Sequence, residues 1–307
     1  MRAFVFPGQG SQYKGMGEVI VSKFEKGREF IKKGEEILEK NLDYLLFEAD
    51  EEELKDTENA QISILLTSYI HFKFLEERGI KPDYVCGHSL GEYSSLLASE
   101  VLSFEDALIL VRERARVMKR YSHEIKGVQL AVMNLNLENL ESLIEKFQER
   151  GVIQIAGYNS KSQIVVSMEE SLSDSFKKEV ENLKGRVLPL KTSLPFHSPL
   201  MKKAEDDFAK ILEETKFNSP KYLYISSVVN EVIQNGDEIK RVLINQITRP
   251  VRWIQTINKL ISFGVKEFYE VGPNKVLTNL GLRDYQNVYF VNSENLIKEE
   301  IKINERV

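Results

Sequence analysis

A serine between two glycines is the feature of the sequence most suggestive of chemistry. Residues 87–91 read GHSLG; they follow a short apolar stretch at 84–86 and precede a helical pattern that begins near Glu92. A serine on a sharp turn between a strand and a helix is exposed at the edge of a sheet, where it can act as a nucleophile. The helix start offers backbone N–H groups, including that of Leu90, to a developing oxyanion. We therefore predict a catalytic Ser89; the alternative is a structural serine in a glycine turn.

A serine nucleophile needs a base, and the chain has only four histidines. His197 lies in the proline-bounded segment LPFHSP at 194–199, and such loops often carry catalytic groups. His88 adjoins Ser89 but points the other way on a sharp turn, so we expect a supporting hydrogen bond from it. Of the other two, His71 lies on a predicted helix and His123 at a helix end, and packing or surface roles are more common there. By elimination, His197 is the best candidate for the base, and no acid stands out as a third member.

An arginine on an apolar helix face is the second chemical signal. The pattern predicts a helix over 104–120, opened by Ser103 and Asp106 in an arrangement that resembles a capping box. At about 100° per residue, Arg114 falls inside the apolar stripe of this helix. A buried guanidinium needs an anion, because an unpaired buried charge is costly. An internal salt bridge and a clamp for a substrate carboxylate are both consistent with this position.

The elements that must position these residues alternate between strands and helices, which predicts an α/β fold. A buried strand at 3–6 leads into a glycine-rich turn at 8–12 that lacks the third glycine of a dinucleotide-binding fingerprint. Further predicted helices occupy 62–77, 200–215 and 251–263, and further strands occupy 84–86, 222–228 and 265–271. The charged tail at 297–307 is expected to fray.

The middle of the chain has a different order. Strands are predicted at 128–133, 152–156, 163–168 and 187–190, and helices at 137–150 and 172–183. This β-α-β-β-α-β order is the ferredoxin-like motif. We therefore predict a ferredoxin-like subdomain at 126–192, inserted into a catalytic parallel-sheet domain made of residues 1–125 and 193–307.

Composition narrows the possible functions. The 307 residues carry a net charge of −5, so a global basic field for nucleic acid is absent. A single cysteine, Cys86, excludes an internal disulfide and a cysteine-rich zinc site, and it favours a reducing cytoplasm. The most apolar stretch, at 62–72, is too short and too polar to span a bilayer, and the N-terminus lacks the apolar length of a signal peptide. No metal or nucleotide site is indicated.

Taken together, the motifs resemble those of the malonyl-CoA:acyl carrier protein transacylase family over residues 2 to about 285. That family has an α/β-hydrolase-like domain with a ferredoxin-like insertion, which agrees with the pattern above. The matching segments are FVFPGQGSQ at 4–12, GHSLGEY at 87–93, the helix of Arg114, the loop of Asn159, FHS at 196–198, Gln246 with PVRW at 250–253, and EVGP at 270–273.

The resemblance implies catalytic roles. Ser89 would be acylated, and His197 would act as general base and then as general acid. A backbone carbonyl at Gln246, in place of a carboxylate, would orient the histidine, which would explain why no acid stands out. Gln9 and the backbone N–H of Leu90 would form the oxyanion hole.

The resemblance also implies substrate-binding roles. Arg114 would grip the malonyl carboxylate, and Gln61 and Asn159 match polar positions around the family's pocket. His88 is grouped with them as a supporting residue. Phe196 before the histidine resembles the malonyl-selective polyketide acyltransferases.

The chain departs from the family's pattern at two positions and in one short segment. Gly157 stands where many members carry a second asparagine, and Ile62 replaces a common proline. The segment VQLA at 128–131 replaces the usual Met-Ala-Ala. These positions concern the pocket lining and the packing of the small subdomain.

The leading expectation is a malonyltransferase of fatty acid synthesis, which moves malonyl from malonyl-CoA to the phosphopantetheine thiol of an acyl carrier protein. The alternatives are an acyltransferase that loads polyketide-synthase carriers, a hydrolase that clears carriers, and a non-catalytic carrier-binding module. We expect no cofactor, no membrane or nucleic-acid partner, and a monomer. Because carriers are acidic, docking requires a local basic patch, for which Lys191, Lys202 and Lys203 are candidates.

Overall fold

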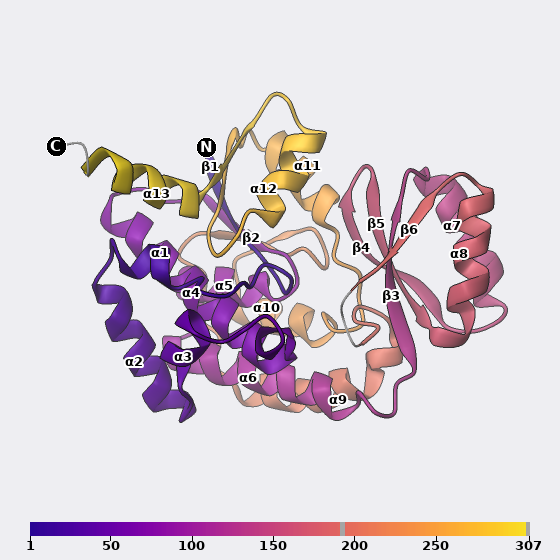
Figure 1. Ribbon diagram of the computed structural model, residues 1–307, viewed down its shortest axis with the longest axis horizontal. Helices are drawn as coiled ribbons and strands as arrows, with labels where there is room; N and C mark the ends of the chain where they lie inside the picture. The colour runs from indigo at the N-terminus through magenta and orange to yellow at the C-terminus, as the bar shows by residue number, and fades with distance from the viewer. Residues whose placement is uncertain (191–193, 305–307) are drawn as a thin grey trace.

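The computed structural model describes residues 1–190 and 194–304, and within them two sheets organise the chain (Figure 1). The large sheet has the strand order β10-β9-β1-β2-β7-β8; all neighbouring strands are parallel except β8, which runs antiparallel to β7. Its strands are β1 (Arg2–Phe6), β2 (Tyr84–Gly87), β7 (Leu223–Ile225), β8 (Val232–Ile233), β9 (Glu267–Glu270) and β10 (Tyr289–Asn292).

Strand β1 lies in the middle of this sheet and is apolar on both faces, as a central parallel strand requires. Phe4 and Phe6 face a core built mainly from helices of the first half of the chain, whereas Ala3 and Val5 face a second core. Helices therefore cover both faces of the sheet (Figure 1). The first core uses α1 (Glu18–Val21), α2 (Lys26–Leu38), α3 (Leu42–Phe47), α4 (Thr57–Glu77), α5 (Gly91–Ala98), α6 (Phe104–Arg120), α9 (Lys202–Glu214) and α10 (Gly236–Ile244), and the second uses α11 (Trp253–Ser262) and α12 (Val276–Asp284).

The small sheet is antiparallel, with the order β4-β5-β3-β6. Helices α7 and α8 cover one face of it, on the side away from the large sheet (Figure 1). Strand, helix, strand, strand, helix, strand follow one another along the chain, so the predicted ferredoxin-like insertion is confirmed. The boundaries at 126 and 192 stay a prediction. The elements are β3 (Gly127–Met133), α7 (Leu137–Gln148), β4 (Ile153–Ser160), β5 (Gln163–Glu169), α8 (Ser173–Asn182) and β6 (Arg186–Pro189).

The helix of Arg114 has the predicted bounds, and the Oγ atom of Ser103 caps it by accepting from the Asp106 N–H at 3.0 Å.

Other elements differ from the prediction. Helix α4 begins at Thr57, five residues early, because Asp56 caps its N-terminus. The tail was expected to fray, but Ser293–Asn304 form helix α13, which is anchored by the fully buried Ile297. Within the described part of the chain, no helix has the length and apolar character needed to cross a membrane.

Candidate active site

Ser89 lies on the tight turn between β2 and α5, in a backbone conformation with φ of 53°. The flanking glycines are needed because the chain segments nearly touch. A Cβ atom on Gly87 would lie 1.8 Å from the Gly91 carbonyl carbon, and one on Gly91 would lie 2.0 Å from the Phe6 oxygen. The turn therefore exposes the Ser89 side chain at the carboxyl edge of the large sheet, as the sequence predicts.

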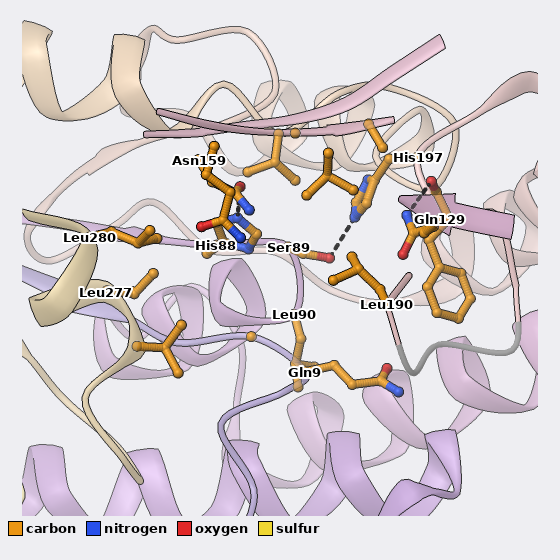
Figure 2. Close-up of a pocket in the computed structure, with 18 of the residues that line it drawn as sticks. Gln9, His88, Ser89, Leu90, Gln129, Asn159, Leu190, His197, Leu277 and Leu280 are labelled. Atoms are coloured by element: carbon orange, nitrogen blue, oxygen red, sulfur yellow. Dashed lines mark hydrogen bonds between the residues drawn. The ribbon is translucent and has the colours of Figure 1, made fainter. Parts of the chain in front are cut away.

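The structure brings Ser89 and His197 together from positions 108 residues apart. The Nε2 atom of His197 lies 2.8 Å from the Oγ atom of Ser89 (Figure 2). On the other side of the ring, Nδ1 lies 2.9 Å from the Gln246 carbonyl oxygen and 3.0 Å from that of Arg249. Because carbonyls only accept, Nδ1 carries the proton and Nε2 is left to accept from the serine. Among the described residues, no carboxylate contacts this ring.

The surroundings keep His197 neutral. Its burial, the Arg114 charge and the neighbouring His88 together lower its pKa to about 3. A neutral imidazole at physiological pH can take the hydroxyl proton of Ser89 as a general base.

The site cavity encloses about 240 Å³ between the two sheets, and Ser89, His197 and Arg114 all line it. Apolar side chains of α12, Leu277 and Leu280, form one wall (Figure 2). This volume is below the range of about 300–1,000 Å³ typical of small-molecule pockets. A cavity of this size has room for an acyl group beside Ser89.

Arg114 enters this cavity from α6 with only 1% of its surface exposed. Its Nη1 donates to the Gln61 Oε1 at 2.6 Å, and its Nη2 lies 3.3 Å from the Ser89 Oγ. Its Nε has no partner, and no carboxylate of the described residues pairs with the guanidinium. The internal salt bridge that the sequence left open is therefore absent from the described part of the chain. A buried cation next to the nucleophile can bind a substrate anion.

Gln9 and Leu90, each with a backbone N–H group, line the cavity beside the serine. In residues 1–190 and 194–304, no protein group accepts a hydrogen bond from either of these N–H groups. Two free donors beside a nucleophile can stabilise the oxyanion of a tetrahedral intermediate.

The remaining predicted residues fall into two groups. His88 Nε2 lies 2.8 Å from the Oδ1 of Asn159, which lines the cavity together with Phe196 (Figure 2). The second group is the predicted basic patch, whose described lysines form ion pairs within the chain. Lys202 pairs with Glu205 and Asp206, Lys203 pairs with Glu124, and Lys191 lies outside the described residues. The two described lysines therefore have intramolecular acidic partners already.

Glu92 is a functional candidate that sequence reasoning missed. It is fully buried and accepts hydrogen bonds from Tyr224, Ser226, the Ser227 backbone and the Gln246 side chain. Burial raises its pKa, and these donors lower it in part. The same Gln246 amide also donates to the Ser89 carbonyl at 2.9 Å.

Through its hydrogen bond with the Gln246 side chain, Glu92 helps to fix both the turn of Ser89 and the backbone segment whose carbonyl contacts the His197 ring. The available signal was a charged side chain in a short helix of otherwise small and apolar residues. Glu270 is a second such case: it accepts from the Leu277 and Thr278 N–H groups and so fixes the start of α12.

The lowered pKa of His197 predicts an unusual pH profile. An ordinary histidine titrates near pH 6.5 and at pH 5.5 is about nine-tenths protonated. For His197 we expect kcat/KM for acylation of the serine to stay flat from pH 8 to about pH 5 and to fall only below that. Stopped-flow measurement with a thioester substrate would check this, and an inflection near pH 6.5 would contradict it.

The same shift has a consequence for stability. In the unfolded chain His197 has its ordinary pKa near 6.5, whereas in the folded protein its pKa is about 3. Between these two pH values the unfolded chain binds a proton that the folded protein does not bind. The free energy of unfolding therefore falls as the pH decreases from 6.5 towards 3. Buried His71, whose pKa burial also lowers to about 3, acts in the same direction.

Comparison with known proteins finds relatives that match almost the whole chain. The family model described as acyl transferase domain matches residues 3–302. The malonyl CoA-acyl carrier protein transacylase of Bacillus subtilis (strain 168) is 39% identical over 280 residues, which cover 91% of this chain and 88% of that protein.

Solved structures match the chain as well. The malonyl CoA-acyl carrier protein transacylase of Clostridium perfringens superimposes with a TM-score of 0.93 at 33% identity, covering 99% of this chain and 98% of that one. A malonyl-transacylase in complex with its type II PKS acyl-carrier protein gives a TM-score of 0.93 at 29% identity, covering 97% and 99%.

The fold and the site define an α/β-hydrolase-like acyl transferase whose cavity holds a serine–histidine pair. Within that class, the chain belongs to the acyl transferase family and, in it, to the malonyl CoA-acyl carrier protein transacylases.

Proposed function

We propose that this protein transfers a malonyl group from malonyl-CoA to the phosphopantetheine thiol of an acyl carrier protein, as a step of fatty acid synthesis. In the first half-reaction, His197 takes the proton of Ser89 while the serine oxygen attacks the thioester carbonyl. The backbone N–H groups of Gln9 and Leu90 donate to the oxyanion. When the intermediate collapses, the carbon–sulfur bond breaks, the histidine returns its proton to the sulfur, and CoA leaves.

The second half-reaction reverses these roles. His197 takes the proton of the carrier thiol, the sulfur attacks the malonyl ester, and Ser89 leaves with the proton restored. The residues required are all supplied by the chain, so we expect no cofactor. Family membership supports the carrier as partner, and we further propose that the enzyme works as a monomer in the cytoplasm.

The observation that carries the malonyl assignment is the unpaired Arg114. Malonyl differs from acetyl by one free carboxylate, and a planar guanidinium recognises a carboxylate through two parallel hydrogen bonds. Neutral acyl groups would leave this buried cation without an anion, which disfavours them. A hydrolase of simple acyl chains would have no use for such a residue.

Replacing Arg114 with alanine should therefore change selectivity. The ratio of kcat/KM for malonyl-CoA to that for acetyl-CoA should drop about a hundredfold, because a charge-assisted pair contributes roughly 3 kcal/mol. Competition between the two thioesters, read as the two Ser89 adducts by mass spectrometry, measures this ratio.

Arg116→Ala is the matched control, because that side chain lies on the same helix but is exposed and pairs with Glu58 and Glu113. Its selectivity should equal that of the unmodified enzyme. A folded Arg114→Ala variant that still prefers malonyl would show that another group reads the carboxylate.

A carrier of polyketide synthesis is the second candidate acceptor. The observation in its favour is the structural neighbour in complex with its type II PKS acyl-carrier protein. Both carriers present the same thiol, so transfer rates to purified carriers of the two kinds would decide between them.

A further inference from the structure

Three polar side chains form a row across the small sheet. Gln129 on β3 pairs directly with Ser167 on β5, and Ser167 pairs with Gln154 on β4. Cross-strand partners share a face, and the adjacent residues Leu130 and Val166 belong to the apolar core under α7 and α8. The polar row therefore lies on the opposite face, towards the active site, where Gln129 is seen close to His197 (Figure 2).

The row donates hydrogen bonds to two consecutive backbone carbonyls. The Phe196 oxygen accepts from Gln129 Nε2 at 2.9 Å and from Ser167 Oγ at 2.6 Å. The His197 oxygen accepts from Gln154 Nε2 at 2.7 Å. Gln129 and Ser167 are 6% and 0% exposed, so these bonds form away from solvent and have little competition from water.

The backbone at this point needs such support. His197 has φ of 57°, in the left-handed region that residues with a side chain rarely adopt. Its N–H donates to the Ile247 carbonyl at 2.9 Å, and its Nε2 reaches the Ser89 Oγ in this conformation. A strained backbone persists only where the surrounding structure imposes it.

We propose that Gln129, Ser167 and Gln154 are positioning residues, which hold the His197 backbone so that Nε2 stays within reach of the nucleophile. The ferredoxin-like subdomain is then part of the catalytic apparatus and does more than form one wall of the cavity. This inference rests on the proposed acyl transfer through Ser89.

Gln154→Leu is the first test, because leucine keeps most of the volume and removes the amide group that donates to the carbonyls of His197 and, at 2.8 Å, Thr248. We expect kcat for acylation of Ser89 to fall about tenfold to a hundredfold, the scale of a misplaced catalytic group, while KM for malonyl-CoA stays within about threefold. Gln148→Leu is the matched control: Gln148 also donates to a backbone carbonyl, that of Ile153, but from α7 on the far side of the small sheet. It should keep full activity.

A double-mutant cycle separates positioning from general destabilisation. In a His197→Asn enzyme the base is already gone, so adding Gln154→Leu should lower the residual acylation rate by less than about twofold. An equal loss in both backgrounds would overturn the proposal, as would a Gln154→Leu enzyme with unchanged kcat.

If Gln154→Leu does not fold, Gln129→Met and Ser167→Ala provide the same cycle at the Phe196 carbonyl, each removing one of its two donors. Failure of the proposed function would be seen separately, because the unmodified enzyme would then form no malonyl ester on Ser89.

Discussion

An enzyme with Ser89 replaced by alanine should form no malonyl ester and lose activity by about five powers of ten. The reason is that, within residues 1–190 and 194–304, Ser89 is the only cavity-lining residue with a hydroxyl, thiol or amine nucleophile, so the covalent route is closed. Intact-protein mass spectrometry after incubation with malonyl-CoA measures the adduct, and transfer of labelled malonyl to the carrier measures turnover.

Ser94→Ala is the matched control for this experiment. Ser94 is a buried serine of α5, the helix that follows the turn of Ser89, but it does not line the cavity. That variant should be acylated normally. A stoichiometric adduct on the Ser89→Ala protein would place the nucleophile elsewhere.

Removal of the base has the second largest expected effect. His197→Ala should slow acylation by a factor of about 10²–10⁴, because the serine would have to attack with its proton still attached or lose it to water. Alanine is also strained at the positive φ of this position, so a lower melting temperature is expected with it.

His197→Asn separates the two effects, because asparagine adopts the left-handed conformation more readily but cannot serve as a base. It should be as inactive as the alanine variant and more stable. His123→Ala, which alters an exposed histidine, should keep full activity. Near-normal single-turnover acylation by His197→Asn would remove the histidine from the mechanism.

The main features of the site were predictable because they depend on local patterns. The GHSLG turn needs only its own glycines, and Arg114 needs only the periodicity of its helix. The same holds for the order of strands and helices in the small sheet, where short segments alternate clearly.

The remaining features depend on contacts between distant segments. The positioning role of Glu92 can be recognised only in the folded protein, where Gln246 and the β7 region surround its carboxylate. The hydrogen bond from Gln129 to the Phe196 carbonyl likewise exists only because the fold brings these distant residues together. Strand β10 and helix α13 were missed for a similar reason. Strand β10 forms because it pairs in parallel with β9, and α13 is held because Ile297 packs into the first core. The composition of this segment alone does not distinguish a packed helix from a frayed charged tail.

The uncharged partners of the His197 ring have a consequence for the choice between thiol and water. Two carbonyl dipoles, rather than a full negative charge, face Nδ1, so the protonated ring is less stabilised and the histidine is a comparatively weak base. A thiol with a pKa near 8.5 gives up its proton to such a base far more readily than water does, with a pKa near 15.7. The hydroxyl of Ser89 is also weakly acidic, but it is held 2.8 Å from the His197 Nε2 and 3.3 Å from the Arg114 Nη2, whose positive charge stabilises the developing alkoxide. The malonyl ester can therefore outlast its exposure to solvent between the departure of CoA and the arrival of the carrier.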